Sequence, residues 1–185
     1  MSVIYLLNNP GAAFQHQRTE SAWIIVGLTI LVIAVGDPLL RSWCMPGYQI
    51  DGQGSLRLIA MGLASYIAVT MILWLICKGF GSQFGFAHCT KSWSITFFPN
   101  LLCAIIVDVT EVFYYVFWNS LQWGLVLSIL YVGILLWKIM LYALFLRFAA
   151  GLQGWKLIAA GVSGAVFIAL LAALNGALGL KTPVL

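Results

Sequence analysis

Charged side chains are scarce in this chain of 185 residues. Asp, Glu, Lys and Arg make up 8% of it, whereas a soluble domain carries about 25%. Hydrophobic residues reach 63%. So few charges cannot cover a surface that faces water, so the composition excludes an ordinary soluble domain. It also argues against a nucleic-acid partner, because no basic and aromatic patch is present.

The motifs of common enzyme and metal sites are missing as well. No helix carries a pair of histidines at zinc-protease spacing, and no Ser, His and Asp fall together at one expected depth. The cysteines are Cys44, Cys77, Cys89 and Cys103. They form no CxxC pair and no disulfide spacing, so we expect free thiols. The sequence therefore predicts no catalytic residue, no metal site and no cofactor.

Long apolar stretches occupy most of the chain. Each is about as long as the ~20 residues with which a helix crosses the hydrocarbon core of a bilayer. They cover residues 22–40, 58–77, 93–116, 123–146 and 157–178. We therefore expect an all-α, polytopic membrane protein, with a bundle of five transmembrane helices over residues 22–185.

Residues 1–21 precede the first stretch and predict a short helix of their own. Asn9 is a favoured capping residue, and Pro10 suits the first helical position, where no N–H is needed. A short apolar run ends at Phe14, and polar residues follow it. We expect an interfacial helix in the headgroup region. A tail without regular structure is the alternative.

Basic residues in the short loops predict an orientation, because cytoplasmic loops carry an excess of Lys and Arg. Those expected on the side of the N-terminus are Arg18, Lys78, Lys91, Arg147 and Lys156. Those expected on the opposite side are Arg41, Arg57 and Lys181. The excess favours a cytoplasmic N-terminus and a C-terminus on the other side of the membrane.

Carboxylates gather near one end of the predicted bundle. Asp108 and Glu111 are three residues apart, so they share one helix face. By helical rise Asp108 lies near the outer headgroup boundary, with Asp37 at a similar depth. Carboxylates within membrane segments usually face the bundle interior and often mark function. One interpretation is a charge-balanced cap with Arg41 and Arg57, and a second is a cation-binding or proton-linked site. A third is that the chain from Asp108 onward is already an interfacial helix.

Lys138 stands inside the fourth stretch, where a central lysine costs about 2.5–3.5 kcal/mol. Its stem reaches only part of the way to the interface. A carboxylate inside the bundle would lower this cost, and Asp108 is at the limit of its reach. We therefore hypothesise an intramembrane polar cluster of Asp108, Glu111, Lys138 and Asp37, in which Lys138 pairs with Asp108 or Glu111.

Pro99 interrupts the third stretch. Proline has no N–H, so it leaves a carbonyl of the preceding turn without its helical partner and commonly kinks the helix. We expect a kink at Pro99 and a neighbouring helix that satisfies the freed carbonyl.

The last stretch is rich in small residues at a spacing of four, which lets helix backbones approach closely in lipid. These residues are Ala160, Gly161, Gly164 and Ala165. Packing within the bundle is the preferred interpretation. A contact between two copies in a homodimer is the alternative.

Three segments, in this order, resemble a known family. The first is residues 9–14 (NPGAAF) with 18–20 (RTE), before the first stretch. The second is the loop 79–84 (GFGSQF), followed by the stretch broken at Pro99. The third is 145–148 (FLRF) with 151–157 (GLQGWKL), before the small-residue stretch. With five stretches, the chain resembles the Yip family of Ypt/Rab-interacting membrane proteins, and most of all its prokaryotic branch.

The resemblance implies a five-helix membrane domain with a cytoplasmic N-terminus, located in the bacterial inner (plasma) membrane. Eukaryotic members bind Rab GTPases and have long cytosolic N-terminal regions. Only residues 1–21 precede the first stretch here, so Rab binding is not carried over, and the family offers no catalytic residues. We expect a non-enzymatic interaction or accessory protein whose partners are membrane lipids and other membrane proteins. A small transporter or channel subunit lined by Asp108, Glu111 and Lys138 is the alternative.

Overall fold

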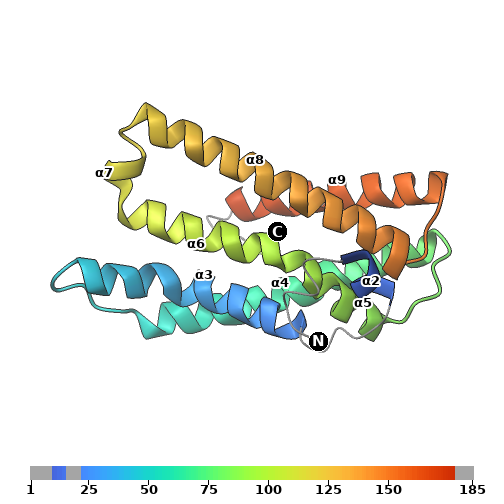
Figure 1. Cartoon of the computed structure of the whole chain (residues 1–185). Helices are drawn as coiled ribbons and strands as arrows, with labels where there is room; N and C mark the ends of the chain where they lie inside the picture. The colour runs from blue at the N-terminus through green and yellow to red at the C-terminus, as the bar shows by residue number, and fades with distance from the viewer. Residues whose placement is uncertain (1–9, 16–21, 178–185) are drawn as a thin grey trace.

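The computed structural model describes residues 10–15 and 22–177 (Figure 1). Within these ranges every regular element is a helix, which confirms the predicted all-α class. In chain order the elements are α2 (Pro10–Gln15), α3 (Ala22–Cys44), α4 (Gly52–Gly79), α5 (Phe86–Trp93), η1 (Ser94–Phe97), α6 (Phe98–Val112), α7 (Tyr114–Phe117), α8 (Leu121–Leu144), η2 (Phe145–Ala149) and α9 (Trp155–Ala177).

Four continuous helical segments are long and apolar enough to cross a membrane, as expected of a membrane protein. They are Trp23–Cys44, Gly52–Gly79, Phe86–Val112 and Leu121–Ala149. A shorter apolar segment, Trp155–Leu171, forms most of α9. Figure 1 shows α3 and α4 as an antiparallel hairpin, with α6 running between this hairpin and α8. Helix α6 packs along both α3 and α8, and α9 packs against α4.

Helix α4 begins earlier than its apolar residues indicate. Asp51 caps it, because its Oδ1 accepts a hydrogen bond from the Gln53 N–H at 3.1 Å. The helix therefore starts at Gly52 rather than near residue 58. Polar residues in the first turn are tolerated because they lie at the exposed end of the helix.

The third long segment is two helices in line, joined by a tighter turn. Helix α5 ends at Trp93, η1 covers Ser94–Phe97, and α6 begins at Phe98, with Pro99 in its first turn. Hydroxyl groups explain the tight turn. Ser94 Oγ donates to the Lys91 carbonyl at 2.5 Å, and Thr96 Oγ1 donates to the Trp93 carbonyl at 2.7 Å. Such bonds from side chain to backbone compete with regular α-helical pairing.

The carbonyl that Pro99 leaves without its α-helical partner is satisfied within the same helical segment. The expectation that a neighbouring helix satisfies the freed carbonyl is wrong. The N–H of Phe98 donates to the carbonyl of Ile95, four residues before the proline. A 3₁₀-type bond thus replaces the α-helical bond that proline removes. The segment also begins at Phe86 and ends at Val112, rather than spanning residues 93–116.

The core is richest in aromatic rings at the end of the bundle that holds α2 and α5. The Phe145 ring contacts three others, with centroid separations of 6.3 Å to Phe14, 6.2 Å to Phe84 and 5.2 Å to Trp93. Phe14 is 1% exposed. Helix α2, which does begin at Pro10, therefore inserts a ring between the helices as well as lying beside them. Asn9 lies outside the described residues.

The long helical segments alternate in direction, and the carboxylates lie at one end with Arg41 and Arg57, while four other basic residues lie at the opposite end (Figure 1). The α4–α5 loop and the α8–α9 connection lie at the end that also holds α2; this is the basic end. Its described basic residues are Lys78, Lys91, Arg147 and Lys156. The α3–α4 loop and α7 lie at the other, acidic end. The described carboxylates, all placed toward it, are Asp37, Asp51, Asp108 and Glu111. Arg18 and Lys181 fall outside the described residues.

Candidate functional site

The acidic end carries a cluster of charges between α3 and α6. Arg41 Nε lies 2.7 Å from Asp37 Oδ1, one turn earlier on α3. Arg41 Nη2 lies 3.9 Å from Glu111 Oε2 on α6. The side chains of Arg41 and Asp37 are about one quarter exposed, at 26% and 27%. Arg41 thus bridges two helices and partly balances the acidic charge, as in the charge-balanced cap.

Asp108 lies deeper in the same cluster. It is 9% exposed, and its Oδ2 atom has no hydrogen-bond partner among the described residues. The carboxylates of Asp37 and Glu111 are its electrostatic neighbours. A Cβ on Gly36 would overlap Asp108 Oδ2, so the carboxylate packs directly on the glycine backbone of α3. The structure therefore brings together three members of the predicted polar cluster.

Lys138 lies elsewhere. It belongs to a stripe of α8 with a spacing of three and four that is buried or half-buried and faces the other helices. The stripe is Leu127, Tyr131, Ile134, Lys138 and Leu141, and Phe145 continues it into η2. Among the described residues the ion pairs within 4.0 Å are those of Arg41, and Lys138 forms none there. The hypothesised pair of Lys138 with Asp108 or Glu111 is absent from the structure.

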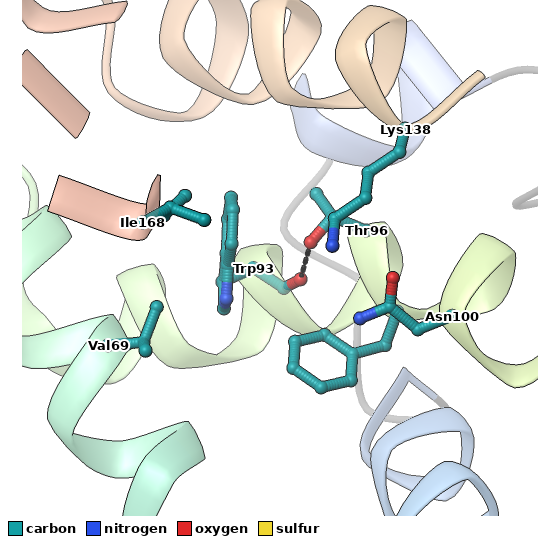
Figure 2. A pocket seen from close by; sticks show the side chains of 7 residues that line it. Val69, Trp93, Thr96, Asn100, Lys138 and Ile168 are labelled. Atoms are coloured by element: carbon teal, nitrogen blue, oxygen red, sulfur yellow. Dashed lines mark hydrogen bonds between the residues drawn. The ribbon is translucent and has the colours of Figure 1, made fainter. Parts of the chain in front are cut away.

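The Lys138 side chain instead enters a small cavity between α8 and the broken segment (Figure 2). The cavity measures about 10 Å³ and is lined by Val69, Trp93, Thr96, Phe97, Asn100, Lys138 and Ile168. This is close to the volume that one water molecule needs. In Figure 2 the lysine points toward Thr96 and Asn100. A lysine, a threonine and an asparagine are therefore the polar residues of a lining that is otherwise apolar.

Trp93 forms another wall of this cavity, and its indole is an unusual group to find there. The residue is 4% exposed, and Nε1 has no hydrogen-bond partner in the described part of the chain. An unpaired buried N–H costs about 1–3 kcal/mol. The indole ring thus covers one side of the cavity, while its N–H is fully buried and lies on the side of Val69 in Figure 2.

A larger cavity opens next to the small one, between α8 and α9, and we name it the α8–α9 groove. Its volume is about 350 Å³, and its lining residues are Trp93, Leu135, Lys138, Ile139, Tyr142, Ala165, Ile168 and Ala169. Trp93, Lys138 and Ile168 line both spaces. Both spaces are mainly apolar, and Lys138 is the charged residue where they meet.

The small residues of α9 contact two other helices. Ala160 and Gly164 are buried, and Tyr142 Oη donates long hydrogen bonds to the carbonyls of Ala160 and Gly161, at 3.4 and 3.3 Å. A Cβ on Gly164 would overlap that hydroxyl. These contacts agree with packing inside the bundle. Ala165 is exposed and lines the groove.

The segments at the basic end also touch one another. Ser82 Oγ donates to the Ala150 carbonyl at 2.5 Å, which ties the α4–α5 loop to the α8–α9 connection. The rings of Phe80 and Trp155 lie 6.2 Å apart, centroid to centroid. With Phe14 of α2 against Phe145, α2 also meets these segments at this end of the molecule.

Two observations concern metal ligands and nucleophiles among the described residues. In the described ranges no group of three or more His, Cys, Asp and Glu residues could hold a metal ion. All four cysteines are free, as predicted. Ser92 Oγ lies 3.4 Å from His88 Nε2, but Ser92 is completely buried.

Comparison with protein-family models, curated proteins and solved structures finds no match.

Sequence reasoning placed Lys138 within the bundle but missed the residues around it. Trp93, Thr96 and Asn100 come from a run rich in polar residues, between Thr90 and Asn100, at the start of the third apolar stretch. That run is the signal that could have located the pocket. Gly36 was missed as well, because a single glycine in an apolar stretch does not reveal which neighbour approaches it.

Proposed function

We propose that this chain is a non-enzymatic integral membrane protein of the Yip-like type. It contacts other membrane proteins or lipids and acts as an interaction or membrane-organising factor. In this proposal five helices span the bacterial inner membrane, α9 being the fifth. The basic end, with the N-terminus, faces the cytoplasm, which agrees with the excess of Lys and Arg in cytoplasmic loops.

The observation that carries the proposal is the free face of α8. This helix turns only a narrow stripe toward the bundle and leaves large apolar side chains exposed around the rest of its surface. One exposed row has the spacing of three and four that suits helix–helix contact: Leu125, Ile129, Val132, Leu136 and Ile139. Such a face offers a helical partner or lipid chains a long apolar contact.

Site-specific photo-crosslinking in native membranes tests this proposal. A photoreactive residue at Ile129, which is 73% exposed, is compared with one at Leu127, which is 5% exposed. We expect adducts of defined mass at Ile129 that weaken when Leu136 is replaced by Trp, and none at Leu127. Adducts without a defined mass at both positions, or adducts at Ile129 that are unchanged by Leu136→Trp, would overturn the proposal.

A transporter or channel subunit is the second candidate, and the buried Asp108 carboxylate favours it. The separation of Lys138 from the carboxylates weighs against one continuous polar pathway. Ion flux in liposomes distinguishes the candidates. Flux by the parent protein that is lost in well-folded Asp108→Asn supports transport, whereas no flux above that of empty liposomes supports the interaction role.

A further inference from the structure

We propose that the α8–α9 groove binds the chain of a fatty acid, with the carboxylate of that acid on Lys138. The inference rests on the proposed function, because it names a lipid class that the protein would contact. It depends on charge complementarity at the meeting point of the two cavities.

The first step concerns charge. Lys138 faces the bundle, yet no described acidic side chain lies within 4.0 Å of it, and no carboxylate lines either cavity. A buried ammonium is stabilised by an opposite charge at short range. The missing negative charge is thus the main property that a ligand would bring.

The second step concerns hydrogen bonds. Beside Lys138, the Asn100 amide can donate from the lining of the same cavity. Thr96 already gives its hydroxyl proton to the Trp93 carbonyl, at 2.7 Å. A carboxylate accepts from several donors and gives none. The pocket and a carboxylate are therefore complementary.

The third step concerns the chain of the ligand. The groove of about 350 Å³ is in the size range of small-molecule sites, about 300–1,000 Å³. Its rim residues Leu135 and Ile139 are exposed on the outer side of α8, and the small side chains of Ala165 and Ala169 leave room on α9. A hydrocarbon chain can therefore run from Lys138 toward the surface that lipid covers.

The fourth step separates a fatty acid from a phospholipid. Lys138 lies eleven residues before Ala149, where the candidate span ends, which is about 16 Å along a helix. A phospholipid would have to bring its phosphate and glycerol to that depth. A fatty acid is neutral when protonated, carries a single chain, and can ionise beside the lysine. The depth of Lys138 thus favours the smaller amphiphile.

Photolabelling of the purified full-length protein in nanodiscs tests the proposal. The probe is palmitic acid with a diazirine in its chain, and the matched control is its methyl ester. We expect the acid to label peptides of residues 135–142 and 165–169 at least tenfold more than the ester. Lys138→Met should lower acid labelling to the level of the ester, whereas Lys78→Met at the basic end should leave it unchanged.

A second pair of variants keeps the test valid if Lys138→Met folds poorly. Ala165→Leu with Ala169→Leu fills the groove and should abolish labelling, whereas Val166→Leu, exposed on α9 outside the groove, should not. Equal labelling by acid and ester, labelling that survives groove filling, or preferential labelling by a diazirine phosphatidylglycerol overturns the inference. Defined adducts at Ile129 could still be observed in that case. A failure of this inference is therefore distinguishable from a failure of the proposed function.

Discussion

Replacing Gly164 by alanine tests how closely α9 approaches the helices beside it. The added Cβ would overlap Tyr142 Oη and lie 3.1 Å from Leu73 Cδ2. Overpacking of this kind costs about 1–3 kcal/mol, whereas alanine favours a helix by up to about 1 kcal/mol over glycine. We therefore expect Gly164→Ala to lower the free energy of unfolding by up to about 2 kcal/mol.

Two variants give this prediction its controls. Gly161→Ala places a Cβ 3.5 Å from Leu146 Cδ1, an ordinary contact, and should cost nothing. Tyr142→Phe removes the overlapping hydroxyl together with two long hydrogen bonds, so in combination with Gly164→Ala it should restore most of the lost stability.

Denaturant titration of the purified protein in mild detergent, followed by tryptophan fluorescence, provides the measurement. The reasoning is refuted if Gly161→Ala is as damaging as Gly164→Ala, or if Tyr142→Phe gives no rescue. A change of oligomeric state without loss of stability would instead favour the homodimer alternative for the small residues of α9.

Two further predictions concern other close contacts. Gly36→Ala should separate α3 from α6 and lower the thermal midpoint, because its Cβ would overlap the Asp108 carboxylate; Gly27→Ala, with nothing within 4 Å, should not. Rescue of Gly36→Ala by Asp108→Ala is expected, and its absence contradicts the packing argument. Ser82→Ala should cost about 1 kcal/mol and speed hydrogen exchange in the α8–α9 connection, because it removes the bond to that connection. Ser128→Ala removes a bond within α8 at an exposed position, so an equal loss there would refute a special role for Ser82.

The helical class and four long apolar segments could be predicted because each depends on local composition alone. A run of apolar residues fixes its own length, whichever neighbours it has. The position of a helix end is less certain, as Asp51 shows by starting α4 early.

Contacts between helices were predicted less well, because they depend on how each helix is rotated. Helical rise gives the depths of Lys138 and Asp108 along the helix axes. It does not give the rotation of each helix, which decides the neighbour that a side chain faces. In the structure Asp108 faces Gly36 on α3, while Lys138 faces Thr96 and Asn100. Three carboxylates still came together, since Asp37, Asp108 and Glu111 lie near the same ends of two packed helices.

The ring of Phe145 has a consequence for energetics, because one side chain serves three neighbours. The rings of Phe14, Phe84 and Trp93 each contact the Phe145 ring from a different part of the chain. Residues that share a partner do not have independent effects. Truncating any two of the three together will therefore change stability by an amount that differs from the total of the separate changes, and that difference measures how strongly distant parts of this polypeptide depend on one another.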